Sequence, residues 1–127
     1  MNPPVEDSAV SANPQLKGKT SMEVFDATVK SLTDAGVMVI LNNHMSNAGP
    51  CCSDTDGNGM WYNYYYPEDI WYDILAGLTR RYKDNKLVVG NDLRNELRAD
   101  RKHKKTPKWA TGNPKNDWMM AAKKAAS

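Results

Sequence analysis

Polar side chains follow directly after the two apolar stretches of the sequence that look most like buried strands. Asn43 and His44 follow the first stretch, and Asn95 and Glu96 follow the second. In parallel α/β folds the C-terminal ends of the strands form the functional face, so we expect these side chains to lie there. A carboxyl group with a raised pKa can donate a proton near neutral pH. Glu96 is therefore the candidate catalytic carboxylate, and a merely polar strand end is the alternative.

The elements that must position these side chains alternate between helix and strand. In order, we expect a helix over 22–35 capped by Ser21, a strand over 37–41, a helix with Pro67 in its first turn, a strand over 87–93, and a helix around 118–122 capped by Asn113 or Asn116. The alternation favours an α/β fold with a parallel sheet and a right-handed crossover. The unbroken apolar run of the first strand suits burial on both faces. Residues 1–20 show little periodicity and are predicted to be a loop or tail, with the folded domain over 21–127.

Four blocks of the sequence occur in a recognisable order and spacing. They read AGVMVILNNH at 35–44, SNAGPCCSDTDGNGMWY at 46–62, VGNDLRNE at 89–96 and WATGNPKNDW at 109–118. Together they resemble glycoside hydrolase family 5, the cellulase family, over residues 11–125. The resemblance implies part of a TIM (β/α)8 barrel around its third and fourth strands. In such a piece two parallel strands alternate with three helices, and the barrel is not closed.

Family 5 enzymes hydrolyse β-glycosidic bonds with retention, and the resemblance implies roles for three residues of this chain. His44 would bind substrate, Asn95 would hydrogen-bond the sugar 2-hydroxyl, and Glu96 would be the general acid/base. A retaining mechanism also needs a second carboxylate, about 5–5.5 Å away, as the nucleophile. The resemblance thus implies a β-glycan or oligosaccharide as the substrate of the parent protein, and no cofactor.

Two departures from the family pattern weigh against an intact enzyme. Leu97 follows the candidate acid/base where the family usually has proline. A complete barrel needs about 250 residues, whereas this chain has 127 and contains nothing that matches the other strands or the nucleophilic glutamate. We therefore expect the isolated chain to be inactive and marginally stable, with exposed apolar faces. The alternative is an inactive remnant that serves as a carbohydrate-binding or interaction module.

Aromatic residues are concentrated in the long loop after the first predicted strand. Because sugars stack on aromatic rings, Trp61 and Tyr62 are candidate substrate-binding residues, with ordinary packing as an equal alternative. Trp109, in a later loop, is a similar candidate. Trp71 and Trp118 fall within predicted helices, so we expect them in the core.

The same loop holds both cysteines of the chain, Cys51 and Cys52. Adjacent cysteines bond to each other only through a strained ring. We therefore expect two free thiols or, in a secreted parent, a partner cysteine elsewhere. Residues 54–59, DTDGNG, match the first half of an EF-hand calcium loop, but the twelfth position is Tyr65 instead of glutamate. The prediction here is a turn and no metal site.

Composition bears on several other classes of protein. With 40% apolar residues, 25% charged residues and a net charge of +2, the chain is globular in character, and we expect no nucleic-acid partner. The basic stretch 98–108 has no interleaved aromatic residue and is interpreted as a solvated loop. No segment reaches the roughly 18 apolar residues of a membrane span, so we expect no membrane partner. No signal peptide is visible; we expect a secreted parent, and the location of this chain stays open.

Overall fold

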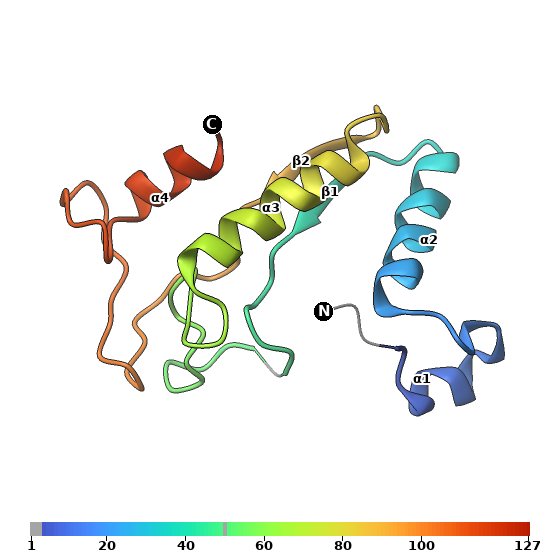
Figure 1. Cartoon of the computed structure of the whole chain (residues 1–127), viewed down its shortest axis with the longest axis horizontal. Coiled ribbons are helices and arrows are strands. Elements are labelled where there is room, and N and C mark those ends of the chain that lie inside the picture. Colours follow the sequence, from blue (N-terminus) through green and yellow to red (C-terminus); the bar gives the residue numbers. More distant parts are fainter. Residues whose placement is uncertain (1–3, 50) are drawn as a thin grey trace. The chain divides into compact units, whose positions relative to one another are not determined.

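A computed structural model describes residues 4–49 and 51–127 of the chain. Its elements are α1 (Asp7–Ala12), the 3-10 helix η1 (Pro14–Leu16), α2 (Ser21–Asp34), β1 (Val39–Asn42), α3 (Glu68–Tyr82), β2 (Val88–Asp92) and α4 (Trp118–Ala125) (Figure 1). Among the described residues, β1 and β2 form one two-stranded parallel sheet that does not close. The predicted α/β architecture, with two parallel strands alternating with three helices, is confirmed.

The prediction that residues 1–20 form a loop or tail is wrong for α1 and η1. Asp7 lies in the first turn of α1, where a negative charge is favoured, and a proline begins η1, where its fixed φ angle is suited to a helix start. Neither helix buries a residue, which explains why hydrophobic periodicity did not reveal them. The segment also folds back, since the Val5 N–H donates to the Lys19 carbonyl at 3.0 Å.

Helix α2 begins one residue earlier than predicted because Thr20, and not Ser21, is its cap. The Thr20 hydroxyl accepts a hydrogen bond from the Glu23 N–H at 3.3 Å, and the Glu23 carboxylate accepts one from the Thr20 N–H at 2.7 Å. This reciprocal capping box satisfies two N–H groups that a helix start leaves unpaired. Helix α4 likewise has a different cap from either predicted asparagine: Asp117 accepts from the Met120 N–H at 3.3 Å.

The chain divides into two compact units. The first holds α1, η1, α2 and the beginnings of both strands, and Val29 is a buried residue of α2. The second holds the rest of the chain.

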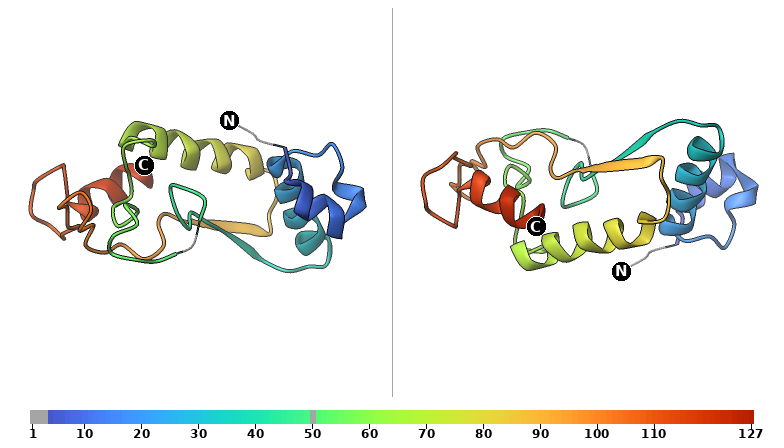
Figure 2. Two further views of the ribbon diagram at one scale, coloured as in Figure 1. Left: turned by 90° about the horizontal axis from the view of Figure 1, so that it is seen from below. Right: turned by 90° about the horizontal axis from the view of Figure 1, so that it is seen from above.

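The core of the second unit consists of Met60, Trp61, Trp71, Leu75 and Ala121. Helix α3 runs alongside β1 and β2 (Figure 2) and packs against α4. Trp71 on α3 and Trp118 on α4 have ring centroids 5.8 Å apart, and the Trp71 indole N–H donates to the Leu93 carbonyl at 3.2 Å. The predicted core position is confirmed for Trp71, whereas Trp118 is partly buried and packs against the core. The two rings tie α3 to α4, and Trp71 also ties α3 to the end of β2.

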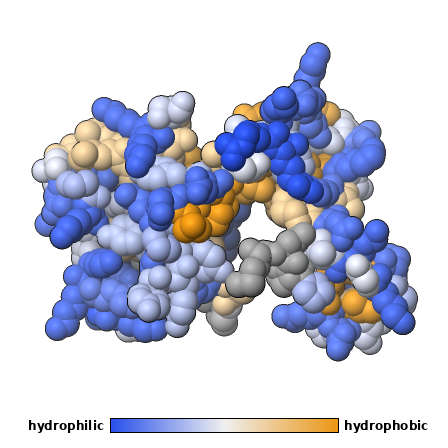
Figure 3. Space-filling model, viewed as in Figure 1, coloured by the Kyte–Doolittle hydropathy of each residue, from blue (hydrophilic) through white to orange (hydrophobic). Residues whose placement is uncertain are grey.

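The strands are less buried than their apolar sequence predicted. Leu41 is 3% exposed, but Ile40 is 64% and Val89 53% exposed. The described residues form a sheet of only two strands, and these exposures show that the expected burial on both faces is not reached. Apolar surface accordingly interrupts the hydrophilic surface of the molecule (Figure 3). Across the described residues, none of the helices has both the length and the apolar character of a membrane span.

Candidate active site

Backbone pairing continues past the two strands and brings their polar ends together. The Asn43 N–H donates to the Asp92 carbonyl at 3.1 Å, and the Asn95 N–H donates to the Asn43 carbonyl at 3.0 Å. The segments that carry His44 and Glu96 therefore leave the sheet side by side at its C-terminal edge. That edge is where a parallel α/β sheet presents functional groups.

Glu96 stands at this edge with an unusual backbone conformation. Its φ angle is +42°, in the left-handed region that a residue with a Cβ atom rarely adopts. The side chain is exposed, and the Arg98 guanidinium donates to the Glu96 carbonyl at 2.8 Å. Strained residues of this kind cluster at functional sites, where the surrounding structure holds them in place. The contact with Arg98 is one interaction that holds the strained residue.

His44 is exposed and is oriented by a chain of hydrogen bonds. Its Nδ1 lies 2.9 Å from the Asn42 Oδ1. The Asn42 amide group donates in turn to the Asp92 carboxylate. Because the amide must turn its NH₂ toward the carboxylate, its oxygen faces the ring, and His44 donates through Nδ1–H. In the neutral form of the ring, the lone pair is therefore on the other nitrogen, Nε2.

Arg94 lies buried beneath these polar groups and was not identified from the sequence. One terminal nitrogen donates to the Asn43 side-chain oxygen at 3.2 Å and the other to the Asn58 carbonyl at 2.8 Å. Burial and the nearby Arg98 lower the pKa of Arg94 to about 10, although Asp56 opposes the shift. The guanidinium thus stays charged at neutral pH and links the strand ends to the long loop. The signal in the sequence was an arginine directly after a strand predicted to be buried.

Most of the basic stretch 98–108 is exposed, as its interpretation as a solvated loop predicts, but two of its arginines also hold the long loop in place. Arg98 donates to the Ser53 carbonyl at 3.1 Å and forms an ion pair with Asp56 at 2.6 Å. Arg101 forms a second ion pair with Asp54 at 2.7 Å. The two arginines therefore engage both of the acids that suggested a calcium loop.

The carboxylate of Asp56 also serves as a turn-forming acceptor. Burial by itself would raise the pKa of Asp56, but N–H groups of Asn58 and Ser53 and the Arg98 guanidinium outweigh it and lower that pKa. The Asn58 N–H lies 2.8 Å from the carboxylate and the Ser53 N–H 3.1 Å. These contacts are those of the turn that the sequence predicted.

The three candidate substrate-binding aromatics differ in the structure. Trp61 is fully buried, and its indole N–H donates to Glu68 at 2.7 Å, which contradicts the expectation that it contacts a sugar. Tyr62 is half-buried; its hydroxyl donates to the Lys115 carbonyl at 2.7 Å, and its ring lines a cavity of about 660 Å³. Trp109 is 66% exposed and remains available for stacking.

The loop that carries Trp109 is held by the buried carboxylate of Asp117. It accepts from the Ala110 N–H at 3.1 Å and from the Gly112 N–H at 2.7 Å. Burial would raise the pKa of Asp117, but these N–H groups and that of Met120 outweigh it, so the pKa is lowered. An exposed tryptophan on a fixed loop is suited to binding a flat apolar surface.

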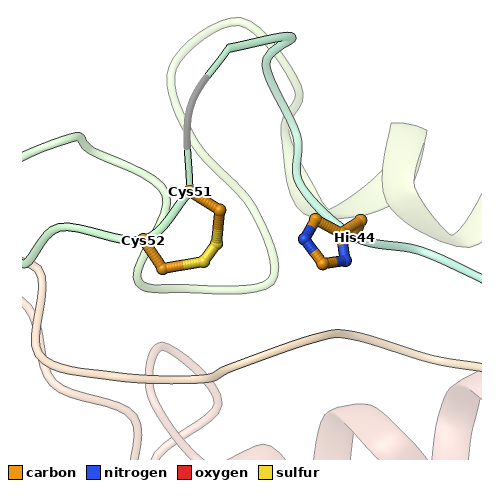
Figure 4. Close-up of side chains that lie close together, drawn as sticks. All are labelled: His44, Cys51 and Cys52. Atoms are coloured by element: carbon orange, nitrogen blue, oxygen red, sulfur yellow. A yellow bond between two sulfur atoms is a disulfide. The ribbon is translucent and has the colours of Figure 1, made fainter.

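The two cysteines do not behave as the sequence predicted. Cys51 and Cys52 are joined to each other, so the expectation of two free thiols is wrong for this structure. A partner cysteine in a longer parent stays a prediction. Both side chains project to the same side of the loop, toward His44 (Figure 4).

Comparison with known proteins settles the family. The sequence model described as Cellulase (glycosyl hydrolase family 5) matches residues 3–127. The chain belongs to glycosyl hydrolase family 5. Its two strands and flanking helices are accordingly part of the TIM-barrel fold of the family 5 endoglucanases that it resembles in structure.

Curated family 5 relatives align with most of this chain but are much longer. An endoglucanase of Paenibacillus polymyxa is 31% identical over 91% of the chain and 26% of the relative. The major extracellular endoglucanase of Xanthomonas campestris is 31% identical over 92% of the chain and 22% of the relative. The chain therefore spans about a quarter of the length of these relatives.

Solved structures give the same relation in three dimensions. The catalytic domain of the major Xanthomonas campestris endoglucanase superposes with a TM-score of 0.73 at 30% identity, over 92% of this chain and 30% of that one. An endocellulase of the archaeon Pyrococcus horikoshii superposes with a TM-score of 0.74 at 26% identity, over 99% of this chain and 33% of that one. The family 5 chain thus corresponds to a third or less of each domain.

Proposed function

We propose that this chain supplies the general acid/base of a retaining β-glucan hydrolase, and that this residue is Glu96. The observation that carries the proposal is the extended backbone pairing of Asn95 with Asn43, which brings Glu96 and His44 to one edge of the sheet. The family supports a glycosidase, and its relatives are endoglucanases. A Pyrococcus horikoshii endocellulase of similar structure was solved with cellotetraose, which supports a β-glucan substrate.

In this proposal Glu96 donates its proton to the glycosidic oxygen as the bond to the anomeric carbon breaks. A second carboxylate attacks that carbon and forms a glycosyl-enzyme ester. Glu96, now ionised, takes a proton from water; the water oxygen displaces the ester, and both carboxyl groups return to their starting states. Asn95 and His44 hold the sugar by hydrogen bonds meanwhile.

The second carboxylate would come from another part of the barrel. The acids of the long loop, Asp54 and Asp56, form ion pairs with Arg101 and Arg98 and are not free to act as that nucleophile. We therefore expect no turnover by the isolated 127-residue chain.

A chimera tests the proposal in a complete barrel. The 92% of the chain that superposes on the Xanthomonas campestris catalytic domain, at a TM-score of 0.73, would replace the matching segment of that domain. We expect hydrolysis of a cello-oligosaccharide by the chimera and a loss of about 10²–10⁴-fold in Glu96→Gln, the usual contribution of an acid/base. A folded, active chimera with undiminished activity in the variant would refute the role of Glu96.

The second candidate function is carbohydrate binding without catalysis, and the 66% exposure of Trp109 on its fixed loop favours it. Binding of cellotetraose to the isolated chain, followed by tryptophan fluorescence, tests it. We expect Trp109→Ala to weaken the interaction and Trp109→Phe, which keeps a ring, to retain most of it. Equal binding by both variants would exclude Trp109 as the stacking residue.

We also propose that the parent protein is secreted. The support is that the similar Xanthomonas campestris protein is described as extracellular. Detection of the parent in the culture supernatant of its source organism, with a cytosolic marker absent, tests this proposal.

A further inference from the structure

Three potential metal ligands meet at the start of the long loop. One nitrogen of His44 and the sulfur atoms of Cys51 and Cys52 all lie within 4.8 Å of one another, which makes this the one such group found among the described residues. The imidazole faces the two sulfur atoms (Figure 4). His44 and Cys51 are exposed and Cys52 is half-buried, so a dissolved ion can reach the group.

The hydrogen bonds of His44 prepare it as a ligand. Metal-binding histidines usually donate their second ring N–H to an oxygen that fixes the tautomer and the direction of the ring. Asn42 does this for His44, accepting from Nδ1 at 2.9 Å, and Asp92 fixes Asn42 in turn. In the neutral ring this hydrogen bond leaves the lone pair on Nε2, the form in which a histidine binds a metal.

The chain contains one other histidine, and its surroundings are different. Nδ1 of His103 lies 2.9 Å from the buried carboxylate of Asp100, and its backbone N–H donates to the same carboxylate at 3.0 Å. Among the described residues, His103 belongs to no group of three potential metal ligands. His103 is therefore a matched control for His44.

We propose that His44, Cys51 and Cys52 form a binding site for one zinc-like cation when the disulfide between the cysteines is reduced. A dithiol reductant supplies the two electrons and two protons that convert the Cys51–Cys52 disulfide into two thiols, and itself becomes a cyclic disulfide. The cation then binds two thiolates and one imidazole, and two protons are released to solvent. A water molecule completes the tetrahedral shell.

The chemistry of the ligands selects this class of cation. Thiolate sulfur and imidazole nitrogen favour zinc and softer ions over magnesium or calcium, which prefer oxygen. With bonds of about 2.3 Å to sulfur and about 2.0 Å to nitrogen, tetrahedral ligands lie roughly 3.5 Å apart. The present separations of up to 4.8 Å need only a side-chain adjustment on an exposed loop. The disulfide form offers no thiolate, so the redox state of the cysteines controls the site.

The test is a metal titration of the whole 127-residue chain. Zn²⁺ binding is measured in competition with a chromophoric chelator, and Cd²⁺ binding is followed by the thiolate charge-transfer absorbance. After the dithiol has been removed in the absence of oxygen, the reduced chain should bind one ion per chain and release two protons. The oxidised chain should bind none. The double variant Cys51→Ser/Cys52→Ser should lose the site, with circular dichroism confirming that its helix content is unchanged.

Two further variants separate this site from adventitious thiol binding. His44→Ala should weaken the affinity at least tenfold while keeping the charge-transfer band, whereas His103→Ala should leave it unchanged. Asn42→Ala should weaken it by about 10–100-fold, as loss of an orienting partner does. Any one of three results would overturn the proposal: equal metal affinities of the His44 and His103 variants, a stoichiometry of two chains per ion, or metal binding by the oxidised chain.

Discussion

At the scale of single residues, the backbone of Glu96 combines strain with a proposed catalytic role. A left-handed φ of +42° costs a residue with a Cβ atom roughly 1–2 kcal/mol, and glycine avoids that cost. Glycine also gives the unfolded chain extra freedom, worth about 0.4–1 kcal/mol in the opposite direction. We therefore expect Glu96→Gly to raise the free energy of unfolding by up to about 1 kcal/mol.

Glu96→Gln is the matched control, because it removes the same charge and leaves the backbone strain. Denaturant unfolding of the two variants checks the prediction. A glycine variant clearly less stable than the glutamine variant would show that Glu96 is not strained.

Asp117 gives the chain a pH-dependent contribution to stability. Its pKa is lowered in the folded state, since the N–H groups of Gly112, Met120 and Ala110 outweigh the effect of burial. The stabilisation is therefore fully present above the unfolded pKa of about 3.9, and it is lost as the pH falls through the lowered folded value. Asp117→Asn should be less stable at neutral pH and should lose less stability on acidification. Urea unfolding midpoints of the wild type and of Asp117→Asn, measured from acid to neutral pH, test this prediction. If stability changed with pH in the same way in both proteins, the pH-dependent contribution would not come from Asp117.

Sequence patterns located Glu96, Asn95 and His44 because their strands are apolar and their neighbours resemble a family. They could not reveal that Trp61 is buried, since an aromatic ring in a loop can face either way. Arg94 was missed because its partners, which include the Asn58 carbonyl, come from a distant loop.

At the scale of elements, the long loop depends on close backbone contact at Gly59. A Cβ atom there would lie 2.6 Å from the Arg98 carbonyl oxygen and 3.0 Å from the Asp100 nitrogen. Because backbone atoms cannot move aside cheaply, Gly59→Ala should destabilise the fold by about 1–3 kcal/mol. Thermal unfolding of the variant measures the effect.

Gly77 in α3 is the control, because a Cβ atom there meets nothing within 4 Å. Gly77→Ala should stabilise the chain by about 0.5–1 kcal/mol, since alanine is the better helix former. If Gly59→Ala and Gly77→Ala both stabilised or both destabilised the chain, the close backbone contact at Gly59 would not explain the effect.

The order of helices and strands followed from hydrophobic period and length, but the ends of the elements depended on single hydrogen bonds. Thr20 and Ser21 are equally plausible caps by residue type, and only the reciprocal bond with Glu23 decides between them. Asp117 caps α4 because the turn before it lets its carboxylate reach several N–H groups at once. Helix α1 has no buried face, so no pattern marks it.

At the scale of the whole molecule, two strands and their helices leave apolar surface that a complete barrel would cover. Met38 is 69% and Ile40 64% exposed. We expect the 127-residue chain to bind a dye for apolar surfaces strongly and to unfold over a broad temperature range. A sharp, cooperative transition from a soluble monomer, without dye binding, would contradict this expectation.

The proposed role of Glu96 is to protonate the leaving oxygen. The most direct test measures, in the chimeric barrel, how the effect of Glu96→Gln on the rate of bond cleavage depends on the leaving group. We predict that Glu96→Gln slows hydrolysis of an unactivated cello-oligosaccharide by about 10²–10⁴-fold. For an aryl cellobioside whose phenolate departs without a proton, cleavage of the glycosidic bond in a single turnover should be nearly unchanged. If Glu96→Gln slowed this cleavage equally for both substrates, Glu96 would not be the residue that protonates the leaving oxygen.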